Sequence, residues 1–158
     1  MLKVRILCVG SCKENYLRQG CAEYLKRLGA FCRPEVVELP ESKLPAEREG
    51  DIARILEQEG KAMLPHLEGC YNIALCVEGK QRSSPDFAKL LEQLPGRGVS
   101  KVNFIIGGSY GIWQPVKDKA DVRLSLSEMT FPHQLFRLML LEQVYRAFAI
   151  NNHIKYHK

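Results

Sequence analysis

The chain has 158 residues, of which 46% are hydrophobic and 26% charged, and it carries a formal net charge of +5. This length suits one ordinary domain, and the composition does not indicate a disordered chain. No stretch approaches the roughly 20 apolar residues of a membrane span, and the apolar run at the N-terminus is too short for a signal peptide. We therefore expect one cytoplasmic domain over residues 1–158.

The strands and helices predicted from the sequence alternate along the whole chain. Apolar and β-branched runs predict strands at residues 3–9, 34–39, 71–77, 102–106 and 122–126. Apolar stripes at helical spacing, with their start and stop signals, predict helices over residues 14–28, 50–67, 114–121 and 132–150, and another from an N-cap at Ser84 to the PGRG stop. The strand at 71–77 is almost wholly apolar and should end at Glu78-Gly79-Lys80. This alternation predicts an α/β fold with a mainly parallel sheet and helices on both faces.

Six cysteines occur, at positions 8, 12, 21, 32, 70 and 76, and no two of them form a CxxC pair. Several lie in apolar runs, so reduced and buried thiols are expected. Cys8 and Cys12 could share a metal, but no His or Cys pair follows at zinc spacing. The sequence therefore predicts no metal site.

Charge is unevenly distributed along the chain. Residues 1–33 carry 7 Lys+Arg against 2 Asp+Glu, residues 34–69 carry 4 against 9, and residues 70–158 carry 12 against 7. If the two basic regions meet on one face, they suit a phosphate-rich partner. An ordinary solvated surface explains the same counts, so charge alone leaves both interpretations open.

A glycine cluster follows the fourth predicted strand, at Gly107, Gly108 and Gly111. Glycines after a strand let a ligand approach the backbone, yet the spacing differs from GxGxxG, and no GxxxxGK[ST] motif is present. The spacing disfavours a nicotinamide-dependent oxidoreductase and a P-loop nucleotide hydrolase. Turn formation and ligand binding remain equally open interpretations of this cluster.

The segment LSLSEMTFP places Ser125, Ser127 and Thr130 where the last strand leaves the sheet. Such a loop can hold an adenosine through backbone hydrogen bonds, or Thr130 can simply cap the helix that begins after Pro132. That helix is apolar over more than one face, which predicts contact with a second subunit.

Three segments carry a resemblance to a known family: IIGGSYG, LSLSEMTFPHQLFR and LLEQVYRAFAINNHIKYHK. With the opening VRILCVG and AEYLKRLG, they resemble the SPOUT methyltransferase superfamily and, within it, the RlmH (YbeA) family, over the whole chain. The resemblance implies a C-terminal trefoil knot, a homodimer, and S-adenosylmethionine as cofactor. The implied activity is methylation of N3 of a pseudouridine in 23S rRNA on the assembled 70S ribosome.

Motif matching to the same family gives the candidate site residues. The implied cofactor contacts are Leu75, Gly107, Gly108, Leu126, Ser127, Glu128, Met129, Thr130 and Phe131. The candidates for handling the N3 proton, or for stabilising the imide anion, are His133, Arg137, Arg146, Tyr156 and His157. The terminal YHK is expected to fold over the active site, either of its own subunit or of the partner.

Several of these assignments have alternatives. His133 and Arg137 share a helix face, so both could meet the substrate or merely pack together, while Glu142 is expected to form an intrahelical ion pair with Arg146. The candidate phosphate contacts are Lys13, Arg18, Lys26, Arg27 and Lys155, each of which could be an ordinary surface charge. The alternative function is a non-catalytic ribosome- or RNA-binding protein with the same fold.

Overall fold

Five parallel strands form a single sheet in the computed structural model, which describes residues 1–158. The sheet has the order β2-β1-β4-β3-β5. Its strands are β1 (Lys3–Val9), β2 (Arg33–Leu39), β3 (Tyr71–Gln81), β4 (Lys101–Ile106) and β5 (Val122–Ser125). The predicted α/β class with a parallel sheet is confirmed, and all five predicted strands are present.

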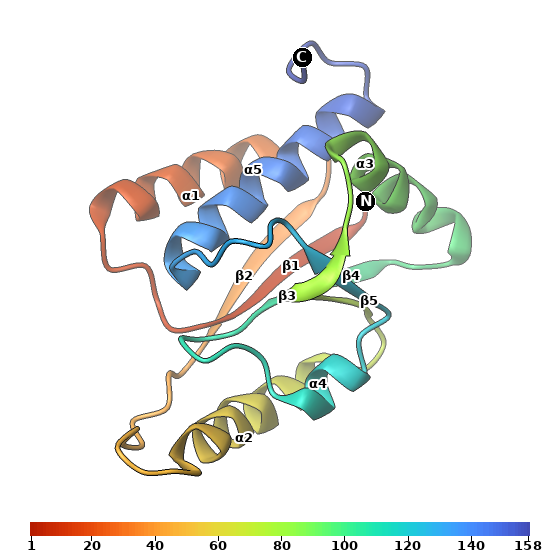
Figure 1. Cartoon of the computed structure of the whole chain (residues 1–158). Coiled ribbons are helices and arrows are strands. Elements are labelled where there is room, and N and C mark those ends of the chain that lie inside the picture. Colours follow the sequence, from red (N-terminus) through yellow and green to blue (C-terminus); the bar gives the residue numbers. More distant parts are fainter.

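Helices cover both faces of the sheet, as Figure 1 shows. One face carries α1 (Asn15–Leu28), α3 (Ser84–Gln93) and α5 (His133–Asn151), and the other carries α2 (Asp51–Met63) and α4 (Gln114–Asp118). Two 3₁₀ turns, Leu64–His66 and Pro95–Arg97, follow α2 and α3. Helix α5 packs between α1 and α3, so it lies across the middle of its layer.

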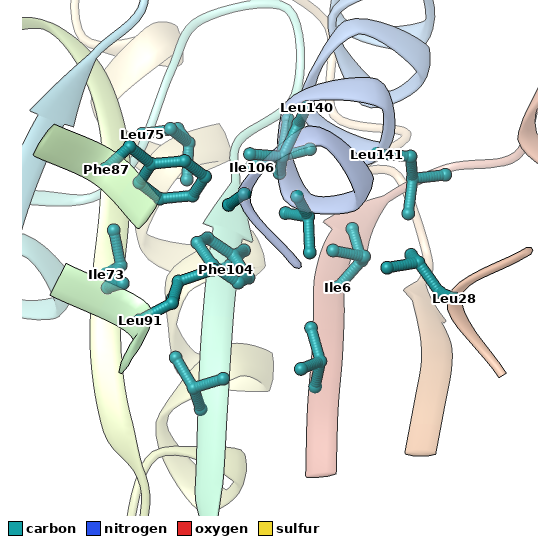
Figure 2. Close-up of a cluster of buried hydrophobic side chains, with 14 of the residues drawn as sticks. Ile6, Leu28, Ile73, Leu75, Phe87, Leu91, Phe104, Ile106, Leu140 and Leu141 are labelled. Carbon is teal, nitrogen blue, oxygen red and sulfur yellow. The ribbon is translucent and has the colours of Figure 1, made fainter. Parts of the chain in front are cut away.

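The core lies on both sides of the sheet because the strand residues alternate between its two faces. Ile6 and Phe104 point toward α5 and meet Leu140 in the larger cluster, where Figure 2 shows their side chains. The adjacent residues Leu7 and Ile105 point the other way, toward α2 and α4. All five side chains are fully buried. The two apolar layers therefore fix the sheet between its helices.

Strand β3 is longer than expected and is interrupted by a bulge. The prediction that it ends at Glu78-Gly79-Lys80 is wrong, because Leu75 and Lys80 both pair with Leu124 of β5 and the strand continues to Gln81. A Cβ atom at Gly79 would lie 2.7 Å from the carbonyl carbon of Leu124, so only glycine fits at this approach. Residues 76–79 are thereby displaced from the sheet.

Two predicted helix caps differ in the structure. Ser83, and not Ser84, caps α3, because the Asp86 backbone N–H donates to Ser83 Oγ at 3.2 Å. Thr130 does not cap α5, whose N-cap is Pro132 without a side-chain cap bond. In both turns the position of the proline alone does not identify the residue that acts as the N-cap.

The remaining bounds differ by a few residues. The predicted helices over 50–67 and 114–121 end earlier, at Met63 and Asp118, where a 3₁₀ turn and a loop take over. No helix combines the length and the apolar character that a membrane crossing requires. All six cysteines are free thiols. Four of them, Cys8, Cys12, Cys21 and Cys32, are buried, while Cys70 and Cys76 are partly exposed.

Candidate active site

A cavity of about 710 Å³ opens where three neighbouring strands end. Its walls are the bulge of β3 at residues 75–78, the glycine loop after β4 at residues 106–112, and the segment from Ser125 to His133 after β5. Lys117 and Phe136 complete it. Ligand sites in parallel α/β sheets form at this edge, because the loops after the strands converge there. The cavity is therefore the candidate ligand site of the fold.

The glycine loop is closed so tightly that it leaves no room for a side chain at Gly107. A Cβ atom at Gly107 would lie 2.2 Å from the carbonyl oxygen of Gly111, and Gly111 has a φ of +94°. Gly108 and Gly111 form a bridge, and the Gly111 N–H donates to the Gly108 carbonyl at 3.1 Å. The loop thus presents backbone to the cavity, which a ligand can approach closely.

The segment after β5 is held by its own serines and not by regular secondary structure. Ser125 Oγ donates to the Ser127 carbonyl at 2.9 Å, and the Met129 N–H donates to Ser127 Oγ at 3.0 Å. No backbone N–H from Leu126 to Phe131 donates to a backbone carbonyl. Apart from the Met129 N–H, which donates to Ser127, these amides are therefore available to a polar ligand in the cavity.

The predicted cofactor residues gather in this cavity. Eight of the nine line it, and only Glu128, which is exposed, does not. The sequence analysis missed Glu78 and Lys117, which form an ion pair on the cavity wall. A hydrogen bond from Lys117 lowers the pKa of Glu78. In the sequence Glu78 is typical of a strand end, and no local signal pairs it with a residue 39 positions away.

Of the five catalytic candidates, only His133 lines the cavity. Arg137, one turn further along α5, is turned away and buried. Its Nη1 donates to Glu38 Oε2 at 2.7 Å and its Nη2 to the Gly10 carbonyl at 3.0 Å. Burial is the largest single effect and opposes its charge, but the bond to Glu38 and the attraction of Glu38, Cys8 and Cys12 together exceed it and raise the pKa of Arg137. Arg137 therefore fastens α5 to the ends of β1 and β2.

The other three candidates form a separate cluster near the end of α5. Arg146 binds Glu142, as expected for an intrahelical pair, and its Nη1 lies 3.1 Å from His157 Nδ1. Tyr156 OH donates to Glu142 Oε1 at 3.1 Å and lies 3.2 Å from the hydroxyl of Tyr24 on α1. Burial and these bonds raise the pKa of Tyr156. The C-terminal tail is thus folded onto α1 and α5.

His133 and the tail cluster are far apart within one chain. Arg146 lies three and a half turns after His133 on the same helix, so the two side chains are separated by roughly 20 Å along its axis. No group of three or more His, Cys, Asp or Glu side chains is arranged to hold a metal ion. One chain therefore supplies a ligand cavity at one end of α5 and a basic, aromatic cluster at the other.

A family model described as "Predicted SPOUT methyltransferase" matches residues 2–157. The chain belongs to the SPOUT methyltransferase family. Among similar proteins, the ribosomal RNA large subunit methyltransferase H of Bacillus thuringiensis is 48% identical over 99% of this chain and 100% of its own length. The predicted resemblance to this family is confirmed.

Solved SPOUT-like structures share the fold at low sequence identity. A tRNA methyltransferase from Aquifex aeolicus matches with a TM-score of 0.54 at 13% identity, over 92% of this SPOUT chain and 69% of that protein. A probable methylase family protein from Haemophilus influenzae matches with a TM-score of 0.55 at 13% identity, over 95% and 66%. The fold is therefore shared by proteins with very different sequences.

Proposed function

We propose that the protein is an S-adenosylmethionine-dependent methyltransferase that acts on N3 of a pseudouridine in 23S rRNA, on the assembled 70S ribosome. The observation that carries this proposal is the full-length 48% identity to a ribosomal RNA large subunit methyltransferase H. The cavity at the sheet edge also supports it, because eight of the nine cofactor contacts that the resemblance implies line it. The whole chain, residues 1–158, acts as one domain.

The cavity fits S-adenosylmethionine in size and chemistry. Its volume of about 710 Å³ lies in the usual range for small-molecule sites. Leu75, Leu126 and Ile112 offer apolar surface for a purine, while Gly107 and the free amides after β5 offer backbone hydrogen bonds. When bound, the cofactor supplies an electrophilic methyl group on its sulfonium. The glycine loop and the β5 segment hold it and exclude water from this group.

The N3 proton of the target base must be removed, and the imide anion that develops must be stabilised. His133 is the titratable candidate that this chain places at the cavity. Arg146, near the end of α5, and the tail residues Tyr156 and His157 packed beside it lie too far from the same cavity to reach it. We propose that they act on the cavity of a second copy, where Arg146 stabilises negative charge and His157 lies beside the substrate base.

A homodimer would bring these parts together. The outer face of α5 lines a groove of about 480 Å³ with Leu138, Met139 and Gln143, next to Tyr24 and Arg82. Partly exposed apolar side chains beside a polar rim suit a subunit interface. The segment after β5 reaches this groove through Leu126, which also lines the cofactor cavity. Pairing through α5 would therefore place one subunit's tail near the other's cavity.

A complementation experiment tests the shared site. Gly107→Trp destroys the cavity and leaves the tail intact, whereas His157→Ala does the reverse. Neither homodimer should be active. Subunit exchange should restore about a quarter of the wild-type activity, because each mixed dimer then holds one intact cavity facing one intact tail. If the mixture stays inactive while mixed dimers form, the site belongs to a single chain.

We further propose that the chain threads a trefoil knot, a departure from the rule that connections do not knot. The displaced bulge of β3 and the return of the chain from β5 to α5 support this topology. Pulling on both termini should stop short of the fully extended length, since a tightened knot retains chain. Full extension would refute the knot.

RNA recognition should rest on the exposed basic side chains near α1 and the tail. Lys13, Arg18, Lys26 and Lys155 are exposed, while Arg27 is paired with Glu23 at 3.0 Å. Phosphate contacts of this kind weaken as salt concentration rises. The alternative, a non-catalytic ribosome-binding protein, shares this property. Methyl transfer from labelled S-adenosylmethionine to purified 70S ribosomes separates the two, because only the enzyme gives time-dependent incorporation.

A further inference from the structure

Behind the glycine loop lies a second, smaller cavity of about 190 Å³ with an acidic lining. It is formed by the loop after β2, by α2, and by Ser109 and Tyr110, which also line the large cavity. Glu41 and Glu59 contribute two carboxylates, and no Lys, Arg or His side chain lines it. The two cavities therefore share one wall, and the smaller one is lined by two carboxyl groups without a basic partner.

Glu59 is buried with half of its carboxylate unused. The residue is only 5% exposed. Its Oε2 accepts the Ser42 N–H at 2.9 Å, but its Oε1 has no hydrogen-bond partner. Burial, the largest effect, raises the pKa of Glu59. A buried carboxylate oxygen without a hydrogen-bond donor destabilises the folded protein. We therefore expect a bound ligand to supply the donor for Glu59 Oε1.

Gly108 allows the Glu59 carboxylate to reach this wall. A Cβ atom at Gly108 would lie 2.9 Å from Glu59 Oε1 and 3.4 Å from Oε2. The backbone of Gly108 faces the large cavity, while Glu59 lies directly against the same residue. One glycine therefore separates the proposed cofactor site from an unsatisfied buried carboxylate.

We propose that the acidic cavity receives the ammonium group of the cofactor's amino-acid end, with Glu59 Oε1 as its acceptor. This inference rests on the proposed function, since it concerns the same ligand. A primary ammonium supplies both the positive charge and the hydrogen-bond donors that this lining lacks. Adenosine then occupies the large cavity, and the amino-acid end passes Ser109 and Tyr110. Glu59 is a specificity-determining residue that favours ligands carrying the ammonium.

Calorimetric titration with three ligands tests this assignment. The ligands are S-adenosylhomocysteine, its deaminated form with hydrogen in place of the ammonium, and methylthioadenosine, which lacks the whole amino-acid end. Wild-type protein should bind S-adenosylhomocysteine about tenfold more tightly than the deaminated form. Glu59→Gln should abolish this difference and leave the affinity for methylthioadenosine within about twofold of wild type.

The matched control is Glu57→Gln on the same helix, where the exposed carboxylate pairs with Lys61. This variant should keep the tenfold preference. Equal wild-type affinities for the first two ligands, or an equal loss for all three in Glu59→Gln, would overturn the proposal and assign the free oxygen to water. The wild-type comparison needs no variant, so it stands even if Glu59→Gln fails to fold. Failure of wild type to bind any of the three ligands would instead reject the proposed cofactor site.

Discussion

Arg137 on α5 and Glu38 on β2 form an ion pair of 2.7 Å in which only the arginine is buried. The arginine side chain is 5% exposed and the glutamate side chain 43%. Removing the two partners should therefore have unequal effects. Glu38 can be hydrated without Arg137, whereas a guanidinium without Glu38 stays buried with only the Gly10 carbonyl as acceptor. This pair is a structural tie between the last helix and the sheet.

We predict that Glu38→Ala lowers the free energy of unfolding by about 2 kcal/mol, because it removes a hydrogen bond and the counter-charge from a buried guanidinium. Adding Arg137→Met should recover part of this loss, so the double variant should be more stable than Glu38→Ala alone. Urea denaturation measures both. Arg27→Met, which breaks an exposed pair with Glu23, serves as the control and should change stability by less than about 1 kcal/mol. A double variant whose loss of stability equals the sum of the losses in Glu38→Ala and Arg137→Met would contradict this account.

Gly107→Ala should abolish cofactor binding, because the new methyl group would lie 2.2 Å from a backbone oxygen of the same loop. The loop backbone would have to move to relieve this clash, and its new shape should no longer fit the cofactor. Titration with S-adenosylhomocysteine measures the loss. Gly96→Ala is the matched control, since a Cβ atom there meets nothing within 4 Å. Normal binding by Gly107→Ala would show that the loop does not shape the site.

Stability should fall in alkaline solution because of the buried thiols. Burial raises the pKa of Cys8 to about 11 and of Cys32 to about 12, from 9.0. The folded state thus keeps protons that the unfolded state releases. Their stabilisation is complete below pH 9 and is lost as pH rises from 9 through 11 to 12, by about 1.4 kcal/mol per pH unit for each thiol.

Chemical denaturation between pH 8 and about 11 measures this slope. Cys32→Ala should reduce the slope of stability against pH by the contribution of one thiol. It also lowers the stability at pH 8, because it leaves a small cavity. A slope unchanged by Cys32→Ala would contradict the burial effect at this thiol.

Cys76 should be protected from alkylation by a bound cofactor. This partly exposed thiol lies on the β3 bulge and lines the large cavity. Cys70 is also partly exposed but lies outside the cavity. Adding S-adenosylhomocysteine should slow modification of Cys76 by a maleimide and leave Cys70 unaffected, as followed by peptide mass spectrometry. Equal rates at Cys76 with and without the ligand would place the cofactor elsewhere.

Much of the fold could be predicted from the sequence because the strands and helices carry strong local patterns. The apolar runs at 3–9 and 102–106 are typical of buried strands, and the glycines after the second run are typical of a tight loop. The β3 bulge could not be predicted, since Glu78-Gly79 is equally typical of a strand end. Its geometry is set by β5, more than forty residues later, through the close approach of Gly79 to Leu124.

The candidate site shows the same division between local and long-range information. Motif matching predicted most of the residues that line the cavity. Helical spacing could not decide whether Arg137 contacts the substrate, because its partner Glu38 lies on a strand distant in sequence. Glu59 was hidden for a similar reason. It is a glutamate at helical spacing from the buried residues Ile55 and Met63, and the spacing does not show that the loop after β2 and the glycine loop cover its carboxylate.

The most direct test of the proposed function is mass spectrometric mapping of 23S rRNA after purified protein and S-adenosylmethionine act on 70S ribosomes lacking the modification. The account predicts one added methyl group, on N3 of one pseudouridine, and none with Gly107→Trp. No methyl transfer, or transfer to another class of nucleotide, would contradict it.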